Sequence, residues 1–527
     1  MRNLISILLL SLALTLQAQL LRPSTHSLMS ADTVHSGLIG SSISDIAGSG
    51  DTLFLGSGHG LGATFDNGES FIGFSRRYSS LGQGGVSALE VYGDTIWVAM
   101  GFDTTTAFGN LKAGGGISRS VDAGASWTWL GQPMDSLQMV VTDGDTSYKK
   151  YSEMDLMGTS ILTVDVVTEV QNITYDLSFD GTRLWATSFG GGLRVSYDLG
   201  DTWNRVMLPW DDLDRLDSTV IQNLATEIQD DPEYYALDPL VHFNHIAFAV
   251  KSWGDTVWVG TSAGINRSLD GGTSWDHFTF YNSNISGNWV IALNRQQLED
   301  GSERIWASTI TTGAGDATGI SFYDPQVGTW RAPFLGSRIW NIGSDANNIY
   351  AATDQGLWKS KDGLHFIALP NFHHADYSEV IYSDAVYAVL VNEDGAVWVG
   401  TGDGLAVSYN EGLSWNISKA RPDDDSEKYF AYPNPFTPRY DKVLNGQGNL
   451  IIRLEADAGD NLSITVYDFN MHRVKEVLTD VETPFSGAQE RTWNGRNEAG
   501  YLVANGTYFI LIEIESKLHW TKVMVIN

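Results

Sequence analysis

Cysteine is absent from the 527 residues, so disulfide bonds and thiolate metal sites are excluded. Basic residues are scarce, with 32 Lys and Arg against 63 Asp and Glu, which gives a net charge of -31. A surface this acidic repels the phosphates of nucleic acids, and we expect no nucleic-acid partner. Proline is also scarce at 13, whereas glycine is abundant at 55 and tryptophan at 18. This mixture is typical of many short strands joined by tight turns.

Long apolar runs are absent after the N-terminus. The one clear run covers residues 4–16, follows Arg2 and ends close to the small residue Ala18. It is too short for a membrane span and predicts a secretory signal peptide over residues 1–18. Because no later stretch of 18 apolar residues occurs, we expect no transmembrane helix in the mature protein.

An apolar phrase such as DTVWVGTS recurs through most of the chain. Its seven copies begin at positions 51, 94, 182, 255, 303, 347 and 396. Each copy belongs to a unit that predicts four short strands, here called A to D, and about 40–50 residues per unit is the period of a propeller blade. The sequence therefore predicts an all-β fold with a seven-bladed β-propeller over residues 37–418, and with insertions at 131–171 and 207–243.

A second phrase, SLDGGTSW at 268–275, returns as SVDAGASW, SYDLGDTW and SYNEGLSW. We expect it to form the turn between strands C and D. Asp270 can accept hydrogen bonds within its own turn, Gly272 can adopt a positive φ, and Trp275 can pack between blades. The residues to which we assign this structural role are Asp66, Asp122, Asp198, Asp270, Asp362, Trp127, Trp203, Trp275 and Trp415.

These turns resemble the Asp-box, or BNR repeat, of sialidases, sortilin-type receptors and several glycosidases. Three copies match well, while the turn at 64–71 has Phe71 in place of tryptophan and the last has Asn410 in place of aspartate. The resemblance implies a propeller. It implies no particular reaction, since in those families the box lies away from the active site.

The tail has a different pattern. A polar stretch at 419–428 predicts a linker, and strand-like runs over 429–527 predict a small Ig-like β-sandwich. The residues of the tail that carry a family resemblance are Tyr432, Pro433, Asn434, Pro435, Phe436, Trp493, Gly495, Gly500, Gly506 and Tyr508.

This tail resembles the C-terminal sorting domain of type IX secretion cargo and the related Ig-like domain of flagellar hook-capping proteins. Asn470 stands where that family more often shows glycine. The resemblance implies passage through the periplasm, contact with outer-membrane secretion machinery, and release or attachment at the surface of a Gram-negative cell. The alternative is an ordinary Ig-like module that binds or spaces.

Loop lengths indicate where a ligand would bind. In an antiparallel blade the B–C loops and the D–A connections share one face, and both insertions and the long B–C loop at 101–116 fall there. The residues that we expect on this ligand face are Trp210, Asp211, Asp212, Tyr234, Tyr235, His59 and Asp403. The alternative for 207–243 is a lid with a solvated acidic face. His242 and His245 fit core packing better than a metal site, and we assign no cofactor, metal or catalytic residue.

The sequence leaves several functions open. The first is a secreted or cell-surface, non-catalytic propeller that binds a glycan or a protein. The second is a secreted glycoside hydrolase of the sialidase or xyloglucanase kind, which would need two carboxylates roughly 5–10 Å apart at the channel mouth. The third is a periplasmic sensor or assembly factor, against which the sorting-like tail argues.

Overall fold

The computed structural model describes residues 25–26, 35–74, 80–136, 139–142, 145–148, 151–313, 315–373, 380–420, 429–438, 449–515 and 517–527. The predicted signal peptide and residues 421–428 of the predicted linker lie outside these described residues. Within them nearly all regular structure is β, so the predicted all-β class is confirmed. None of the helices in this part of the chain has the length and apolar character needed to cross a bilayer.

Seven sheets in the described part of the chain repeat one plan, in which strands A to D pair antiparallel in chain order. The A strands are β3 (Ile43–Ser49), β7 (Gly85–Tyr92), β15 (Thr174–Phe179), β20 (Ala247–Trp253), β24 (Trp289–Gln297), β28 (Ile339–Ser344) and β32 (Val386–Val391). The B strands are β4 (Thr52–Ser57), β8 (Thr95–Thr106), β16 (Leu184–Ser188), β21 (Thr256–Thr261), β25 (Glu303–Ile310), β29 (Ile349–Thr353) and β33 (Val397–Thr401).

The outer half of each sheet follows the same order. The C strands are β5 (Gly60–Thr64), β9 (Gly109–Ser120), β17 (Gly192–Ser196), β22 (Ile265–Ser268), β26 (Gly319–Asp324), β30 (Gly356–Ser360) and β34 (Gly404–Ser408). The D strands are β6 (Ile72–Phe74), β10 (Trp127–Gly131), β18 (Asn204–Val206), β23 (Trp275–Phe278), β27 (Thr329–Leu335), β31 (Ile367–Ala368) and β35 (Asn416–Ser418). Three sheets have a fifth, short strand beside strand D. These pairs are β2 (His35–Ser36) beside β6, β1 (Thr25–His26) beside β10, and β19 (Arg215–Leu216) beside β23.

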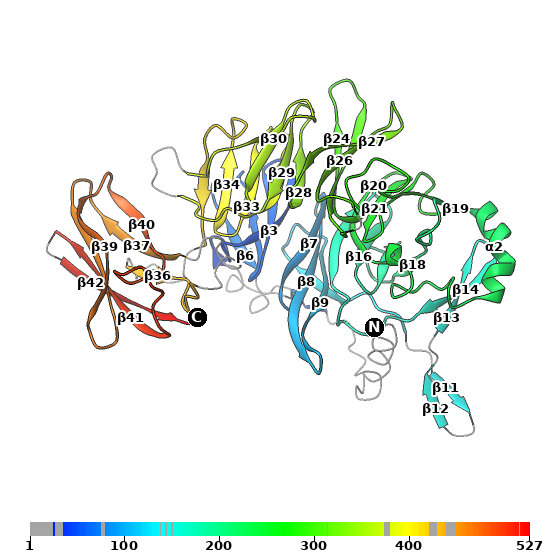
Figure 1. The fold of residues 1–527 in the computed structure, drawn as a ribbon, viewed down its shortest axis with the longest axis horizontal. Helices are drawn as coiled ribbons and strands as arrows, with labels where there is room; N and C mark the ends of the chain where they lie inside the picture. The colour runs from blue at the N-terminus through cyan, green and yellow to red at the C-terminus, as the bar shows by residue number, and fades with distance from the viewer. Residues whose placement is uncertain are drawn as a thin grey trace.

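The A strands form a closed ring. Each contacts the A strand of the next sheet, and β32 of the last sheet contacts β3 of the first. In Figure 1 the blue β3 lies beside the yellow β33 where the two ends of the ring meet. This radial arrangement of four-stranded sheets is that of a β-propeller.

Both faces of every sheet are covered by its neighbours. The B strands are accordingly buried along most of their length, and their short uninterrupted apolar runs are the pattern expected for strands without a solvated face. Each B strand presents one large aromatic side chain to the space between sheets. These side chains are Phe54, Trp97, Trp185, Trp258, Trp306, Tyr350 and Trp398.

The two ends of the ring carry different turns. At one end, the C–D turns bond to the A–B turns of the same sheet, as in Asn67 N to Asp51 O at 3.1 Å and Ala123 N to Asp94 O at 2.9 Å. We call this end the hairpin face. The B–C loops and D–A connections meet at the other end, which we call the loop face; there Gly190 N donates to Gln171 O at 2.9 Å. The predicted B–C loop at 101–116 is instead the regular extension of β8 and β9, visible as a projecting hairpin in Figure 1.

The two insertions form one unit. The first contains the hairpins β11 (Met139–Thr142) with β12 (Asp145–Tyr148) and β13 (Tyr151–Leu156) with β14 (Thr159–Val164). The second contains the helix α2 (Ser218–Asp230), whose N-terminus is capped by the Asp217 carboxylate. The two are joined by Leu237, which bonds through its backbone to residues of β14 and buries its side chain in a shared core.

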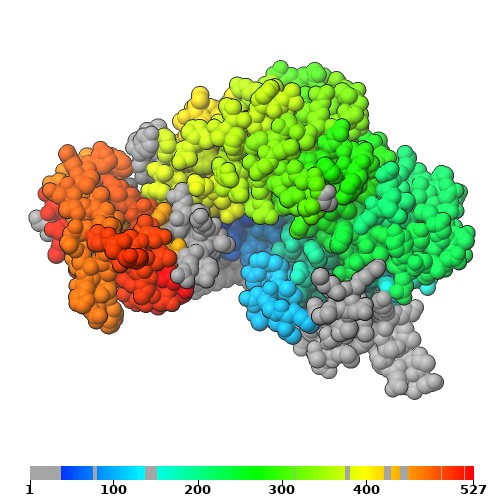
Figure 2. Space-filling model, in the orientation of Figure 1, coloured from blue at the N-terminus to red at the C-terminus, as the bar shows by residue number. Residues whose placement is uncertain are grey.

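The tail contains two sheets around one core. One sheet has the order β36 (Phe430–Tyr432), β37 (Leu450–Ala456), β40 (Gly487–Trp493), and the other has the order β39 (Arg473–Glu482), β38 (Asn461–Tyr467), β41 (Gly506–Ile514), β42 (Lys517–Val525). Their inward side chains form a single apolar cluster that includes Phe436, Trp493 and Tyr508. Figure 2 shows the tail as a separate lobe beside the last sheet.

Candidate functional site

The C–D turns share one hydrogen-bonding pattern. In the turn at 64–71, Asp66 Oδ1 accepts from Thr64 Oγ1 at 2.8 Å and from Ser70 N at 2.9 Å, and Thr64 Oγ1 accepts from Gly68 N at 2.8 Å. The hydroxyl of Ser70, bonded to the other carboxylate oxygen, is the main reason that the pKa of Asp66 is lowered. The same pattern surrounds Asp122, Asp198 and Asp270. In each of these turns the carboxylate and the first hydroxyl are bonded within the turn, so both groups have a structural role.

These turns also join neighbouring sheets. Gly68 of the first sheet leaves no room for a side chain, because a Cβ there would lie 2.7 Å from Trp398 of the last sheet. Leu199 O accepts from the Trp97 indole at 2.9 Å, and a Cβ on Gly272 would lie 2.7 Å from Trp185. The turn of one sheet thus lies against the B-strand aromatic side chain of the preceding sheet. Of the expected tryptophans, Trp127, Trp275 and Trp415 are buried and Trp203 is half-buried.

The residues that we expected on a ligand face from the second insertion have other roles. Trp210 is fully buried in the core of the insertion unit, so its ring is not open to a ligand. Asp211 accepts from Phe243 N at 2.9 Å and Asn244 N at 2.8 Å, and so caps the short 3-10 helix η2 (Phe243–His245). Burial corrects the expectation for Trp210, and these two bonds show that the Asp211 carboxylate is already occupied.

The three other expected residues of this insertion, Asp212, Tyr234 and Tyr235, also make their contacts within it. Tyr234 donates its hydroxyl to Asp212 at 3.3 Å, and Tyr235 donates to Glu227 of α2 at 2.9 Å. The two tyrosine rings lie edge to face with centroids 5.0 Å apart. The alternative of a packed lid with an acidic outer surface therefore describes this region better than an open sugar platform.

The two B–C loop residues have different surroundings. His59 is exposed on the loop face, and its neighbour Gly58 lies directly against Gly85. Asp403 is buried, with 3% of its side chain exposed, and Lys419 Nζ lies 2.9 Å from its Oδ2. The expectation that Asp403 is open to a ligand is therefore wrong, because Asp403 is committed to an ion pair that leads into the tail.

His242 and His245 lie inside the insertion unit. His242 Nε2 is 2.7 Å from Tyr234 O, and the two histidine rings are 5.9 Å apart. Burial, helped by the proximity of His242, holds the pKa of His245 well below its usual value, so its ring is neutral. Both side chains are 2% exposed, as expected for core packing.

A feature of the loop face that we did not predict from the sequence is a bulge near the start of every A strand. In each sheet one residue of strand A has no partner on strand B, and such bulges re-aim a side chain. The unpaired residues are Ser44, Ser87, Tyr175, Phe248, Ile291, Trp340 and Tyr387. We call the opening that they surround the channel mouth.

Aromatic rings follow the channel mouth over five consecutive sheets. Tyr175 and Phe248 have centroids 5.2 Å apart, and Phe248 and Trp289 are 5.7 Å apart. The ring centroids of Trp340 and Tyr387, in the next two sheets, are 6.1 Å apart. Trp289 is 37% exposed, and Tyr175, Trp340 and Tyr387 are half-buried. We call these five residues the aromatic arc; its partly exposed rings are the kind of surface on which apolar ligand faces stack.

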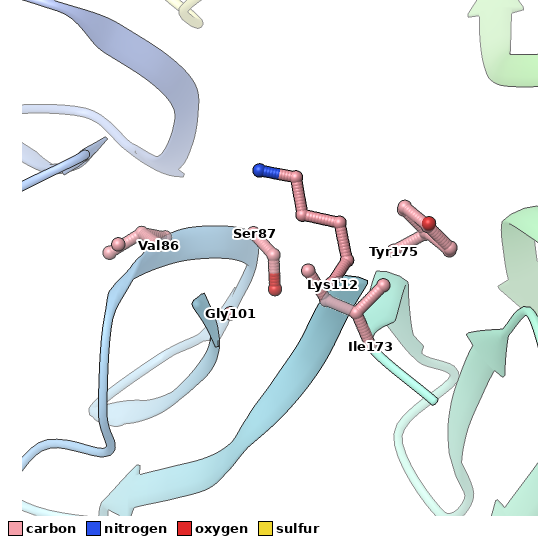
Figure 3. A pocket seen from close by; sticks show the side chains of 7 residues that line it. Val86, Ser87, Gly101, Lys112, Ile173 and Tyr175 are labelled. Atoms are coloured by element: carbon pink, nitrogen blue, oxygen red, sulfur yellow. The ribbon is translucent and has the colours of Figure 1, made fainter. Parts of the chain in front are cut away.

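A cavity of about 220 Å³ opens at one end of the aromatic arc. Its lining residues are Gly85, Val86, Ser87, Gly101, Lys112, Ile173 and Tyr175. Figure 3 shows the Lys112 side chain between Ser87 and Tyr175. Lys112 Nζ also pairs with Asp103 at 2.8 Å, at a largely exposed position. The cavity therefore combines an aromatic wall, a cation and three small residues, which are Gly85, Ser87 and Gly101.

Carboxylates lie further along the A strands, on the inside of the ring. Burial raises the pKa of Asp45 to about 6, with repulsion from Asp176 adding to it, and burial raises the pKa of Glu90 to about 7. The attraction of Asp176 raises the pKa of Lys251, which holds the ammonium charged. Each carboxylate accepts a backbone bond from the next sheet. These bonds are Leu89 N to Asp45 Oδ2 at 2.8 Å, Phe179 N to Glu90 Oε1 at 2.8 Å and Val250 N to Asp176 Oδ2 at 2.9 Å. The three carboxylates therefore tie the sheets together.

The chain matches no protein-family model and no curated protein. Among solved structures it is similar to PorZ, a surface component of the type IX secretion system of Porphyromonas gingivalis, at 14% identity and a TM-score of 0.39. That likeness covers 91% of this chain, which spans 64% of PorZ. YCF48 from Cyanidioschyzon merolae is similar at 13% identity with a TM-score of 0.36, and the likeness covers 70% of this chain and 91% of the YCF48 chain. The WD40 propeller domain of Doa1 is similar at 12% identity with a TM-score of 0.40, and the likeness covers 76% of this chain and 100% of the Doa1 chain.

Proposed function

We propose that this chain is a secreted or cell-surface binding module without catalytic activity of its own. Its ring is a seven-bladed Asp-box propeller that holds a glycan or protein ligand at the channel mouth. Its tail is an Ig-like sorting domain that carries the propeller through the outer membrane of a Gram-negative cell. In this proposal the ligand site stays on the loop face, where the sequence suggested it, and shifts from the second insertion, His59 and Asp403 to the channel mouth.

The observation that carries the binding proposal is the aromatic arc. Five side chains from consecutive sheets lie at one end of the ring, and bulges place four of them there. A stable apolar core would not leave Trp289 37% exposed beside Phe248. The rigid ring holds the arc in place, as a scaffold holds the loops of a binding site.

The carboxylates support a binding role over hydrolysis. A glycosidase needs one carboxylate to donate a proton and another to act on the sugar. Asp45, Glu90 and Asp176 instead accept backbone N–H groups of the adjacent sheet, and Lys251 holds a charge among them.

A glycan-array screen of residues 19–527, combined with a hydrolysis assay on every glycan retained, tests the binding proposal. We expect retention without cleavage, and we expect Trp289→Ala to abolish it, because this ring is the most exposed of the arc. Retention that survives Trp289→Ala would contradict a site at the channel mouth, and release of sugar would favour the hydrolase.

The export proposal rests on the tail motif, whose residues are built into the fold. Phe436 is fully buried, and its N–H donates to Met524 O at 2.7 Å. Asn434 accepts from Met524 N at 3.0 Å. The motif therefore covers the edge of β42, the last strand. Deletion of 429–527 in a host with type IX machinery should leave the product in the periplasm, whereas unchanged export would contradict the proposal.

A further inference from the structure

A guanidinium lies beside the aromatic arc without a carboxylate partner. Arg338 stands in the D–A connection that precedes β28, and its side chain is exposed. Its Cζ lies 4.6 Å from the centre of the Trp340 ring, which is its one interaction within the described residues. The chain has 63 acidic and 32 basic residues, so carboxylate partners are plentiful elsewhere. The arrangement leaves this cation open to a ligand.

Stacking on Trp340 prepares Arg338 to bind a planar anion. A guanidinium that lies against an aromatic ring uses its flat face for that contact. Its N–H donors lie in the plane and stay free to form two parallel bonds to a carboxylate. The Trp340 contact thus orients the donors of Arg338 without using them.

The rest of the arc supplies surfaces that suit sugar rings. Tyr175 and Tyr387 make no hydrogen bond through their hydroxyls within the described residues. Burial raises the pKa of both, so each hydroxyl keeps its proton and can donate to a ligand. Aromatic faces with nearby hydroxyl donors match the apolar faces and hydroxyl groups of successive sugars.

We propose that the channel mouth binds an acidic glycan, with sugar rings against the aromatic arc and the carboxylate of a uronic acid at Arg338. This inference rests on the proposed binding function and names its ligand class. A peptide C-terminus also carries a carboxylate. The glycan is favoured because the aromatic rings extend over five sheets, which a row of sugar rings would cover and a single terminal residue would not.

The channel carboxylates do not cancel this charge preference. Asp45, Glu90 and Asp176 lie inside the ring, where each accepts a backbone N–H, and the charge of Lys251 acts on all three. Lys112, at the other end of the arc, pairs with Asp103 in solvent, where such pairs are weak and readily exchanged. Arg338 is therefore the cation that decides the charge of the ligand.

The test is calorimetric titration of residues 19–527 with oligogalacturonate and with the same oligomer after reduction of its carboxyl groups. We expect the acidic oligomer to bind and the reduced one to bind at least tenfold more weakly, since a charge-assisted bidentate pair contributes about that factor. Arg338→Gln should weaken the binding of the acidic oligomer by roughly tenfold and leave the affinity for the reduced oligomer unchanged. Arg331→Gln is the matched control, because it removes one exposed guanidinium from the outer strand β27.

The outcomes separate this inference from the proposed function. Equal binding of both oligomers, with both lost in Trp289→Ala, would overturn the preference for acid and keep the site. Tighter binding of a peptide with a free C-terminus, lost when that terminus is amidated, would replace the glycan by a peptide. If neither Trp289→Ala nor Arg338→Gln changes the retention of any array glycan, both proposals fall.

Discussion

Lys419 and Glu490 form an ion pair that joins the ring to the tail. Lys419 Nζ lies 3.1 Å from Glu490 Oε2, and the side chains are 3% and 4% exposed. The same ammonium bonds Asp403 in the last sheet, and Tyr432 donates its hydroxyl to Glu490 at 2.7 Å. The predicted linker therefore begins with a residue that is fixed in a buried network, and the tail is docked on the loop face.

Lys419→Met should undock the tail. The substitution leaves Asp403 and Glu490 buried without their shared cation, and breaking a buried pair in this way costs about 3–5 kcal/mol. The interface opens at lower cost than either part unfolds, so we expect a larger radius of gyration in small-angle scattering and faster proteolysis between 421 and 428.

The matched control for this variant is Lys361→Met. Lys361 lies 3.1 Å from Glu411 and is 71% exposed, so its loss should change the free energy of unfolding by no more than about 1 kcal/mol. Scattering curves that coincide for Lys419→Met and Lys361→Met would show that the network does not hold the tail in place.

The repeats could be predicted from sequence because each copy carries its own local signal. Residues equivalent to Asp270 and Gly272 recur at fixed spacing in several turns, and the hydrogen bonds of each turn join residues within the same eight positions. Strand order follows from chain order in such units, and the A-to-D pairing was predicted on that basis.

The site could not be predicted in the same way. Tyr175, Trp340 and Ser87 are equivalent only through the bulge in each strand, and nothing in their identity marks that position. A usable signal would have been the aromatic residue near the start of several A strands. The misplacement of Trp210 and Asp403 has a different cause, since their burial depends on partners far away in sequence.

Gly68→Ala should weaken the closure of the ring. Its Cβ would lie 2.7 Å from Trp398 in the last sheet, and the residue has a φ of +87°. Overpacking and backbone strain together should lower the free energy of unfolding by about 2–4 kcal/mol, measured by urea denaturation.

Gly328→Ala separates the two contributions. Gly328 has a φ of +72°, but nothing lies within 4 Å of its Cβ position. We expect a loss of about 1 kcal/mol from the backbone alone. Equal losses in the two variants would mean that the Gly68 contact does not hold the first sheet against the last.

Asp66→Asn should reduce the dependence of stability on acid pH. The hydroxyl of Ser70 is the main cause of the lowered pKa of Asp66, so the folded state takes up its proton at lower pH than the unfolded chain. The stabilisation is fully present above the unfolded pKa of 3.8 and is lost as the pH falls through the folded pKa. Asn410 occupies the equivalent position in the last turn and bonds Ser414 through both side-chain atoms, so asparagine fits.

The measurement is the melting temperature of Asp66→Asn and of the unchanged chain between pH 7 and the acid limit. The unchanged chain should be the more stable of the two near pH 7, and this advantage should shrink or change sign as the pH falls below the unfolded pKa of Asp66. A constant difference over the whole range would show that the Asp66 charge contributes nothing.

Asp45→Asn should change the pH dependence of stability in the opposite direction to Asp66→Asn. Burial, with repulsion from Asp176, raises the pKa of Asp45 to about 6, so the folded state keeps this proton longer than the unfolded chain. The contribution of Asp45 to stability is therefore most favourable below the unfolded pKa of 3.8 and is lost as the pH rises through about 6. Asn341 holds the same place in β28 and accepts from Val389 N at 3.3 Å, as Asp45 accepts from Leu89 N, so the bond to the next sheet can survive the substitution.

The expected result is a gain in the free energy of unfolding for Asp45→Asn that grows between about pH 4 and pH 6 and is constant above it. Its size should reach about 1–3 kcal/mol, since one pKa unit corresponds to about 1.4 kcal/mol and the side chain retains some access to the channel. Glu90, whose pKa burial raises to about 7, titrates in both proteins, and loss of the Asp45 charge removes one of the smaller causes of that raised pKa. Urea denaturation at each pH gives the values, and a variant that is less stable than the unchanged chain at pH 8 would show that the Asp45 charge supports the ring.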